Sequence, residues 1–172
     1  GRSAPATNGG QTHGSAGRAS DVVVSSRVRL ARNLAGFRFP NRAPASERTA
    51  VVGRLKPIVL GARLSPQVEW VDLTSTTAMH RLSLVEERLI SRQHAMGKPG
   101  EPMHGRAVAI GLHERRLSIM INEEDHLRLQ VMRRGFDLSG ALEEIDAADD
   151  AIEQKADYAF SPRFGYLTAC PT

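Results

Sequence analysis

The chain has 172 residues, of which 41% are hydrophobic, so it is long enough to form one domain with a buried core. It has no apolar run of the length that a membrane helix needs, no visible signal peptide, and a single cysteine, Cys170. These observations exclude a disulfide framework and a zinc site made of this chain's own cysteines. They favour a cytoplasmic protein.

The net charge of +4 is unevenly distributed along the chain. Residues 1–64 contain eleven Lys and Arg against two acids, whereas residues 65–172 contain twelve against seventeen. Twenty of the twenty-three basic residues are Arg, which suits bidentate binding of oxyanions but can equally reflect a preference for Arg codons. The basic amino-terminal half leaves a nucleic-acid-binding module open as an alternative function, although no aromatic platform accompanies it.

Two regions differ in composition at the start of the chain. Residues 1–20 contain no large aliphatic or aromatic side chain, so we expect a disordered tail, with the folded part in residues 21–172. Residues 21–33 then alternate like a strand, with apolar side chains at most even positions and Ser25, Arg27 and Arg29 at odd ones. Two arginines at i and i+2 form a double fork suited to neighbouring phosphate oxygens, and an exposed strand with solvated arginines is the alternative.

The next elements follow from periodicity and turn residues. We predict a helix over 45–60 with Ser46 as its cap and Pro57 bending or ending it. A helix over 74–90 should turn four apolar side chains inward: Met79, Leu82, Val85 and Leu89. A helix over 138–156 should bury four others and leave the acids of 143–153 in solvent: Leu138, Leu142, Ile145 and Ile152. The remaining predictions are a strand over 68–73, a mobile loop over 96–104, a hairpin over 107–112 and 117–122, and extended structure over 158–171.

The stretch Leu117–Gln130 contains the densest group of polar side chains that could carry chemistry. Read with a period of two, its odd positions are apolar on both sides of Glu123, Glu124 and Asp125. In a continuous strand, Glu124 and Arg128 would share the polar face, about 13 to 14 Å apart. The flanking Ile and Leu pull the acids inward, where buried carboxylates need cationic partners or a charged substrate. A solvated run of acids is the alternative.

The chain has no Gly-x-x-x-x-Gly-Lys phosphate loop, no dinucleotide fingerprint and no His-Glu-x-x-His motif. Three other segments stand out: Ser25-Ser-Arg-Val-Arg-Leu-Ala-Arg-Asn33, Asn122-Glu-Glu-Asp-His-Leu-Arg128 and Tyr166-Leu-Thr-Ala-Cys-Pro-Thr172. In this order, and over about 150 residues, they resemble the ATP:guanidino phosphotransferase family, which includes the creatine and arginine kinases and the bacterial protein-arginine kinases. The resemblance covers residues 21–172.

The bacterial protein-arginine kinase branch is the more similar one. Members that phosphorylate metabolites have a helical domain of roughly a hundred residues before the Ser-Ser-Arg-x-Arg strand, whereas only twenty-four residues precede Ser25 here. The segment 85–91 also resembles the bacterial branch. The resemblance therefore implies a bacterial, cytoplasmic kinase that phosphorylates arginine side chains of proteins with ATP.

The resemblance also implies roles for individual residues. It implies an ATP site formed by seven residues: Ser25, Ser26, Arg27, Val28, Arg29, Arg88 and Arg128. Glu124 would clamp the substrate guanidinium and accept its proton, and Cys170, as a thiolate, would lie beside it. Glu123 and Asp125 would support the guanidinium and the Mg²⁺ network. ATP and Mg²⁺ are the implied cofactors, and no set of protein ligands for the metal is assigned.

Two features depart from the family pattern. Arg88 stands where the family usually has a histidine that contacts the nucleotide, although an arginine could stack on a base or pair with a phosphate there. The sequence also stops at Thr172, before further phosphate-binding arginines and a second substrate carboxylate of the family. We therefore expect residues 21–172 to be the amino-terminal portion of a catalytic domain, and an incomplete one. The sequence leaves open whether this portion is active on its own. A catalytically inactive nucleotide-binding or adaptor homologue is the alternative.

The expected fold is α+β, with a mainly antiparallel sheet whose polar face forms the site and whose other face is covered by helices. The expected partners are ATP and protein substrates with exposed arginines, without a membrane or nucleic acid. The sequence leaves the oligomeric state open, a homodimer of the full-length protein included.

Overall fold

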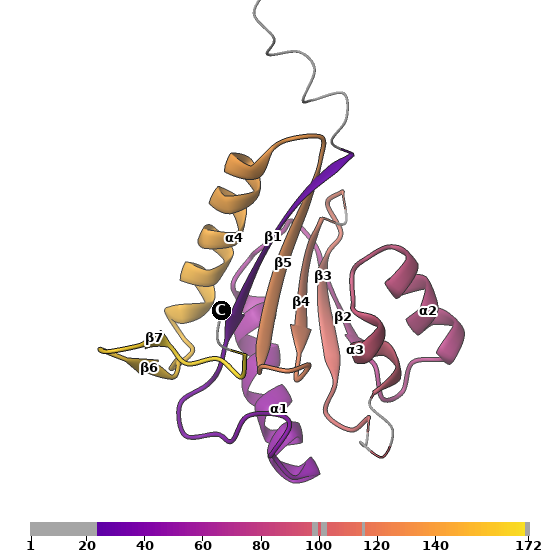
Figure 1. Cartoon of the computed structure of the whole chain (residues 1–172). Coiled ribbons are helices and arrows are strands. Elements are labelled where there is room, and N and C mark those ends of the chain that lie inside the picture. Colours follow the sequence, from indigo (N-terminus) through magenta and orange to yellow (C-terminus); the bar gives the residue numbers. More distant parts are fainter. Residues whose placement is uncertain (1–23, 98–99, 101–102, 115, 171–172) are drawn as a thin grey trace, which may run out of the picture.

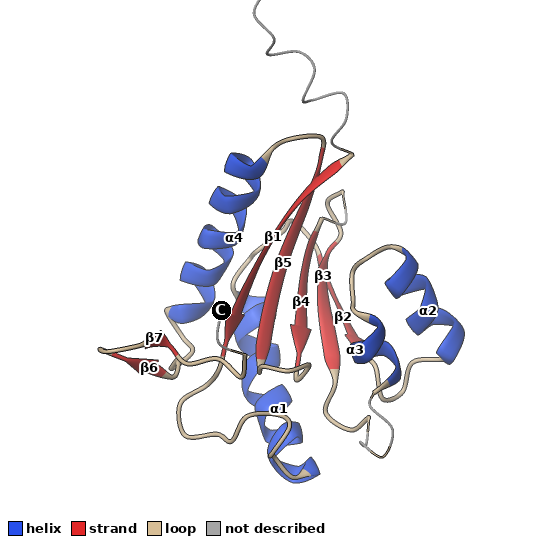
Figure 2. Cartoon of the chain, viewed as in Figure 1, coloured by secondary structure: helices blue, strands red, loops and turns tan. Residues whose placement is uncertain are grey.

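The structure is a computed structural model, and it describes residues 24–97, 100, 103–114 and 116–170. The expected tail, residues 1–20, lies outside this part of the chain. Within it the fold is α+β, as expected, with a five-stranded antiparallel sheet, four helices and a small two-stranded hairpin (Figures 1 and 2). None of the described helices combines the length and the apolar character that crossing a membrane requires.

The sheet has the strand order β1-β5-β4-β3-β2, and all neighbouring strands are antiparallel. Its strands are β1 (Ser25–Arg32), β2 (Val68–Asp72), β3 (Ala107–Gly111), β4 (Leu117–Ile121) and β5 (Leu127–Arg134). The predicted hairpin of β3 and β4 is confirmed. β1 comes first in the chain and pairs with β5, so the fold brings the amino-terminal arginines next to the segment after the three acids.

The prediction of one continuous strand over Leu117–Gln130 is wrong. The chain turns back on itself at residues 122–126, and β4 and β5 pair with Ile121 opposite Leu127 and Ile119 opposite Leu129. Because this turn contains an odd number of residues, odd-numbered side chains of both strands point to the same face. The period of two therefore continues through the turn, and the sequence pattern alone could not reveal the reversal.

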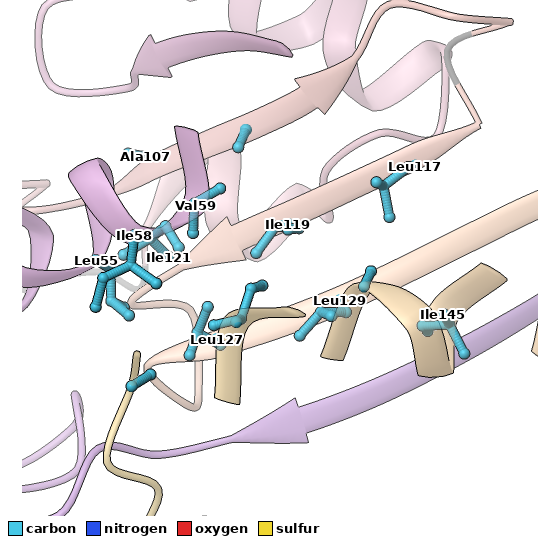
Figure 3. Close-up of a cluster of buried hydrophobic side chains, with 14 of the residues drawn as sticks. Leu55, Ile58, Val59, Ala107, Leu117, Ile119, Ile121, Leu127, Leu129 and Ile145 are labelled. Atoms are coloured by element: carbon cyan, nitrogen blue, oxygen red, sulfur yellow. The ribbon is translucent and has the colours of Figure 1, made fainter. Parts of the chain in front are cut away.

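Helices α1 (Ala45–Gly61) and α4 (Leu138–Glu153) cover one face of the sheet. Figure 3 shows their apolar side chains against the odd-numbered residues of β4 and β5, with Leu55, Ile119, Leu129 and Ile145 each at most 1% exposed. Burying side chains of this size contributes about 1.5–3 kcal/mol each and fixes the orientation of the sheet. Pro57 does not end α1, and the residue before α1 is Pro44 with no side-chain cap, so the predicted Ser46 cap is wrong.

Helices α2 (Ala78–Glu86) and α3 (Arg92–Met96) lie on the opposite face, at the β2 side of the sheet (Figure 2). They bury a second apolar cluster against β2, β3 and β4: Val71, Leu73, Leu84, Leu89, Ile90, Ala95, Val108, Ile110 and Met120. Helices therefore flank the sheet on both faces, and those of the second face lie beside the expected polar face. This cluster covers only part of the second face, and Arg27 and Arg29 of β1 remain exposed there.

The predicted inward faces of two helices are only partly correct. In α2, which starts after its Thr77 cap, Met79 is 79% exposed and Leu82 48% exposed. In α4 the buried face includes Asp149, one turn after Ile145, so the acids of 143–153 are not all solvated. Asp149 accepts hydrogen bonds from Arg32 at 2.5 Å and from the Tyr158 hydroxyl at 3.1 Å. Asp149 can be buried on the apolar face of α4 because Arg32 of β1 supplies the opposite charge.

The carboxyl-terminal segment returns to the β4–β5 turn. After the hairpin of β6 (Phe160–Ser161) and β7 (Gly165–Tyr166), the chain passes beside the end of β1, where Asn33 Nδ2 donates to the Leu167 carbonyl at 3.0 Å. The Ala169 N–H then donates to Asp125 Oδ1 at 2.6 Å. This contact places the neighbouring Cys170 close to the turn that contains Glu123, Glu124 and Asp125.

Candidate active site

Three arginines of β1 and β5 project from one face of the sheet. Arg29 pairs with Gln130, and Ala31 pairs with Arg128. Residues opposite one another, or two positions apart along a strand, share a face, so Arg27, Arg29 and Arg128 lie on the same surface. Partial burial, and then the charges of Arg27 and Arg128, lower the pKa of Arg29 from its usual value. These three positively charged side chains form an arginine face that attracts anions.

An open pocket lies at one end of the arginine face. It has a volume of about 460 Å³ and is lined by Ser25, Arg27, Arg88 and Met132. Sites for small molecules typically have volumes of roughly 300–1,000 Å³. Three of the residues predicted to bind ATP therefore meet in a pocket large enough for part of a nucleotide.

Arg88 reaches this pocket from the segment between α2 and α3. Its backbone is left-handed, with φ 61°. Arg88 follows the end of α2, at a position where helices usually have a glycine with a left-handed backbone. The next residue, Leu89, donates its N–H to the Leu84 carbonyl at 2.9 Å, as is usual at such helix ends. Gln130 Nε2 donates to the Arg88 carbonyl at 2.7 Å, which ties this segment to the arginine face. Such backbone strain, held in place by tertiary contacts, is typical of ligand sites.

Two predicted ATP-binding residues do not point to the arginine face. Val28 packs against the helix-covered core. Ser26 is 4% exposed, and its hydroxyl donates to the Gly135 carbonyl at 2.8 Å and accepts from the Asp137 N–H at 3.0 Å. Because the side chains of a strand alternate, these two residues belong to the face opposite Arg27 and Arg29. A contact of their backbone with ATP stays a prediction.

The turn that carries the acids is anchored through Asn122. This residue has a left-handed backbone, φ 57°, a conformation that Asn adopts more readily than most residues. Its Nδ2 donates to the carbonyls of Arg48 at 3.0 Å and Gly105 at 2.7 Å, and its N–H donates to the His126 carbonyl at 3.1 Å. The turn is thereby fixed to α1 and to the segment before β3.

Glu123 joins this turn to the arginine face. Its side chain is only 3% exposed, and its Oε2 accepts from Arg128 Nη1 at 2.6 Å. Its Oε1 accepts from the hydroxyl of Ser91, the residue that caps α3. Both carboxylate oxygens therefore have a partner, as a buried charge requires.

Glu124 has a different environment. It is half-buried and forms no hydrogen bond or ion pair with another of the described residues. It lines a pocket of about 140 Å³ together with Glu123 and Cys170, and two arginines, Arg48 and Arg106, also line this pocket. The volume is below that of typical sites for whole small molecules, roughly 300–1,000 Å³, and suits the head of one side chain. We call this the carboxylate pocket.

Asp125 points away from the carboxylate pocket. Its Oδ1 accepts from Asn33 Nδ2 and from the Ala169 N–H, both at 2.6 Å. These contacts hold the end of β1, the turn and the carboxyl-terminal segment together. The exposed Cys170 is next to Ala169 and lines the carboxylate pocket with Glu124.

Two buried histidines lie beneath the site. The His126 Nδ1 accepts from the Leu34 N–H at 3.0 Å and its Nε2 donates to the Arg38 carbonyl at 2.9 Å, so the ring is neutral. The His94 Nε2 donates to the Ala107 carbonyl at 2.9 Å. Burial lowers the pKa of both, to about 4 for His94. These histidines support the structure and do not line either pocket.

Several residues of the site were not predicted from the sequence. Ser91 was not singled out, and the carboxylate pocket has six further lining residues: Pro40, Asn41, Arg48, Gln93, Arg106 and Ala169. They come from segments far apart in the chain, and no local pattern marks them. Among the described residues, no group of three or more His, Cys, Asp and Glu side chains could hold a metal ion.

An arginine face joined to a carboxylate pocket is the arrangement expected of a phosphotransferase that acts on a guanidinium group. Residues 58–172 match the family described as ATP:guanido phosphotransferase, C-terminal catalytic domain. The chain therefore belongs to the ATP:guanido phosphotransferase family.

The chain is similar to bacterial protein-arginine kinases. It is 44% identical over 155 residues to that of Halothermothrix orenii, which covers 88% of this chain and 42% of the relative. It is 43% identical over 158 residues to that of Symbiobacterium thermophilum, covering 89% and 42%. The chain thus spans less than half the length of these curated relatives.

Solved structures confirm the fold. The substrate-free duplicated taurocyamine kinase from Schistosoma mansoni matches with a TM-score of 0.79 and 25% identity, over 89% of this chain and 22% of that one. Lombricine kinase matches with a TM-score of 0.70 over 88% of this chain and 44% of that one. Its identity of 22% supports the fold alone.

Proposed function

We propose that this chain forms the ATP-binding and guanidinium-binding part of a kinase that phosphorylates arginine side chains of proteins. The observation that carries the proposal is the carboxylate of Glu124, which has no partner among the described residues and lies one residue from the Glu123–Arg128 ion pair that leads to the arginine face. Similarity to protein-arginine kinases supports proteins as the substrates. Because the chain matches 42% of these relatives, we propose that residues 21–172 are the amino-terminal portion of the catalytic domain.

The carboxylate pocket suits the substrate guanidinium. An arginine side chain has a pKa above about 12 and is a poor nucleophile until a carboxylate orients it and takes a proton. Glu124 has both oxygens available for the two parallel N–H bonds that a guanidinium offers. A pocket of about 140 Å³ admits a side-chain head, and Cys170 would lie beside it.

The arginine face suits the phosphates of ATP. In the proposed reaction a guanidinium nitrogen forms a bond to the γ-phosphorus, the bond from that phosphorus to the β,γ-bridging oxygen breaks, and ADP leaves. The proton lost by the nitrogen goes to Glu124. Negative charge spreads over the phosphoryl oxygens in the transition state, and Arg27, Arg29 and Arg128, which share one face of the sheet, would stabilise it.

Mg²⁺ would reach the site with the nucleotide. This ion is commonly held by substrate phosphates, water and one or two carboxylates, and it neutralises phosphate charge in phosphoryl transfer. Glu124 is the described carboxylate of the pocket without a protein partner, whereas both oxygens of Glu123 are engaged. Because Glu124 serves the guanidinium, we propose that the nucleotide phosphates and water would hold the metal.

Protein phosphorylation tests this proposal. The full-length protein is incubated with ATP, Mg²⁺ and an unfolded arginine-rich protein, and acid-labile phosphoarginine is measured. We expect transfer by the wild type, loss of transfer in Glu124→Gln, and wild-type transfer in Glu143→Gln, which changes an exposed acid of α4 in the same way. Full activity of Glu124→Gln would remove this carboxylate from the proposed role.

A nucleotide-binding homologue without transfer is the second candidate. The observation in its favour is Arg88, which lines the pocket beside Arg27 at the position where the family usually has a histidine. Binding of MgATP by calorimetry without formation of phosphoarginine by the full-length protein would establish it.

A further inference from the structure

Ser91 makes two contacts at the junction of α3 and the β4–β5 turn. Its hydroxyl accepts from the His94 N–H at 3.0 Å, which caps α3, and donates to Oε1 of Glu123. The other oxygen of Glu123 accepts from Arg128. The Ser91 hydroxyl is thus the first group in a series of hydrogen bonds that runs through Glu123 to Arg128 on the arginine face.

Arg128 needs this support because neighbouring positive charges repel its guanidinium group. Arg27 and Arg29 share its face, and their like charges repel a third guanidinium. A long arginine side chain also has considerable rotamer freedom unless it is held. Glu123 supplies the described ion pair that fixes Arg128, and its side chain is 3% exposed. A buried carboxylate keeps one orientation only when both oxygens have partners.

Ser91 is itself rigidly placed. Its neighbours Leu89 and Ile90 are 2% and 4% exposed and pack in the second apolar cluster. The cap places the Ser91 backbone in extended geometry, φ −78° and ψ 157°. The hydroxyl is therefore a fixed donor and not a mobile surface group.

We infer that Ser91 is a positioning residue for nucleotide binding, which acts by orienting Glu123 and through it Arg128. The inference rests on the proposed ATP site and adds a residue that does not contact the ligand. Loss of the hydroxyl leaves Oε1 of Glu123 without its donor, so Glu123 turns and Arg128 is released. The consequence is weaker binding of nucleotide phosphates.

Variants of the full-length protein separate this role from simple helix capping. Ser91→Ala removes both contacts, Ser91→Thr keeps the hydroxyl, and Ser91→Gly removes the hydroxyl while remaining a tolerated cap. Thr77→Ala is the matched control, because Thr77 caps α2 through the His80 N–H at 3.2 Å and is exposed. The measurements are the Kd for MgADP by calorimetry, the KM for ATP and the Tm.

We expect Ser91→Ala and Ser91→Gly to raise the Kd for MgADP about tenfold, the effect of one lost charge-assisted hydrogen bond. Ser91→Thr should bind as the wild type does, and Thr77→Ala should lower the Tm without changing the Kd. A Kd within twofold of the wild type in Ser91→Gly, or in a folded Ser91→Ala, would overturn the inference. Because the readout is binding, it is independent of whether the wild type forms phosphoarginine. A wild type that does not bind MgADP would overturn the inference together with the ATP site.

Discussion

Arg128 Nη1 donates to Glu123 Oε2 at 2.6 Å, and this contact joins the arginine face to the carboxylate pocket. A site that transfers a phosphoryl group to a guanidinium must hold an anion and a cation side by side. The Glu123–Arg128 ion pair connects the arginine face to the carboxylate pocket. Because Arg128 is paired with Glu123, Glu124 remains available for the substrate guanidinium.

A double-mutant cycle on Glu123 and Arg128 should give a coupling free energy of about 1.5–3 kcal/mol, as expected for a hydrogen bond to a charged group. The measurement is urea unfolding of the single and double Ala variants. The pair Arg38 and Glu47 is the control, because its arginine is 66% exposed and solvent weakens such a pair. Equal coupling in both pairs would contradict the buried, fixed geometry described for Glu123.

Replacement of Arg88 by Gly should raise stability and weaken nucleotide binding. The left-handed backbone of Arg88 is strained for any residue with a Cβ, so we expect a gain of about 0.5–1 kcal/mol in the free energy of unfolding. Arg63→Gly is the matched control, because Arg63 has φ 53° and is exposed outside both pockets. It should gain similar stability and leave the Kd for MgATP unchanged. Unaltered MgATP binding in Arg88→Gly would exclude Arg88 from the ATP site.

Asp125→Ala should release Cys170 from the carboxylate pocket. The variant loses the two hydrogen bonds at Asp125 Oδ1, and we expect a loss of about 1–3 kcal/mol in the free energy of unfolding. Cys170 is the only cysteine of the chain, so its alkylation rate reports the position of this segment. Asp125→Asn keeps an oxygen acceptor and should alkylate at a rate closer to that of the wild type. Identical alkylation rates in the wild type and Asp125→Ala would show that this contact does not position the thiol.

The stability of the fold should decrease as the pH falls from 6.5 to about 4. His94 has its pKa lowered to about 4 by burial, from 6.5 in the unfolded chain. In this window the unfolded chain takes up the proton first, so the free energy of unfolding falls, by up to about 3 kcal/mol from His94, and is unaffected above pH 6.5. His126, whose pKa burial also lowers, contributes in the same direction.

Urea unfolding at several pH values measures this dependence. His94→Gln should reduce its slope, and His80→Gln, which changes an exposed histidine of α2, should not. An unchanged slope in His94→Gln would mean that this ring is not the group that titrates.

Alternation along the first strand predicted that Arg27 and Arg29 share a face, whereas the place of Arg128 in the ATP site was implied only by the family resemblance. The pairing of Arg29 with Gln130 and of Ala31 with Arg128 could not be predicted, since register depends on contacts between distant segments. The reversal at 122–126 was missed because its odd length preserves the period of two. The buried position of Asp149 was missed because its partner Arg32 is more than a hundred residues away.

The most direct measurement compares Arg29→Ala with Glu124→Gln in the full-length protein, by MgADP binding and by phosphoarginine formation. The two-part site predicts that Arg29→Ala raises the Kd for MgADP about tenfold. Glu124→Gln should keep the Kd within twofold and lose transfer by a factor of about 100 or more. Transfer at the wild-type rate in Glu124→Gln, or a loss of nucleotide affinity equal to that of Arg29→Ala, would contradict the separation of a phosphate-binding face from a guanidinium-binding pocket.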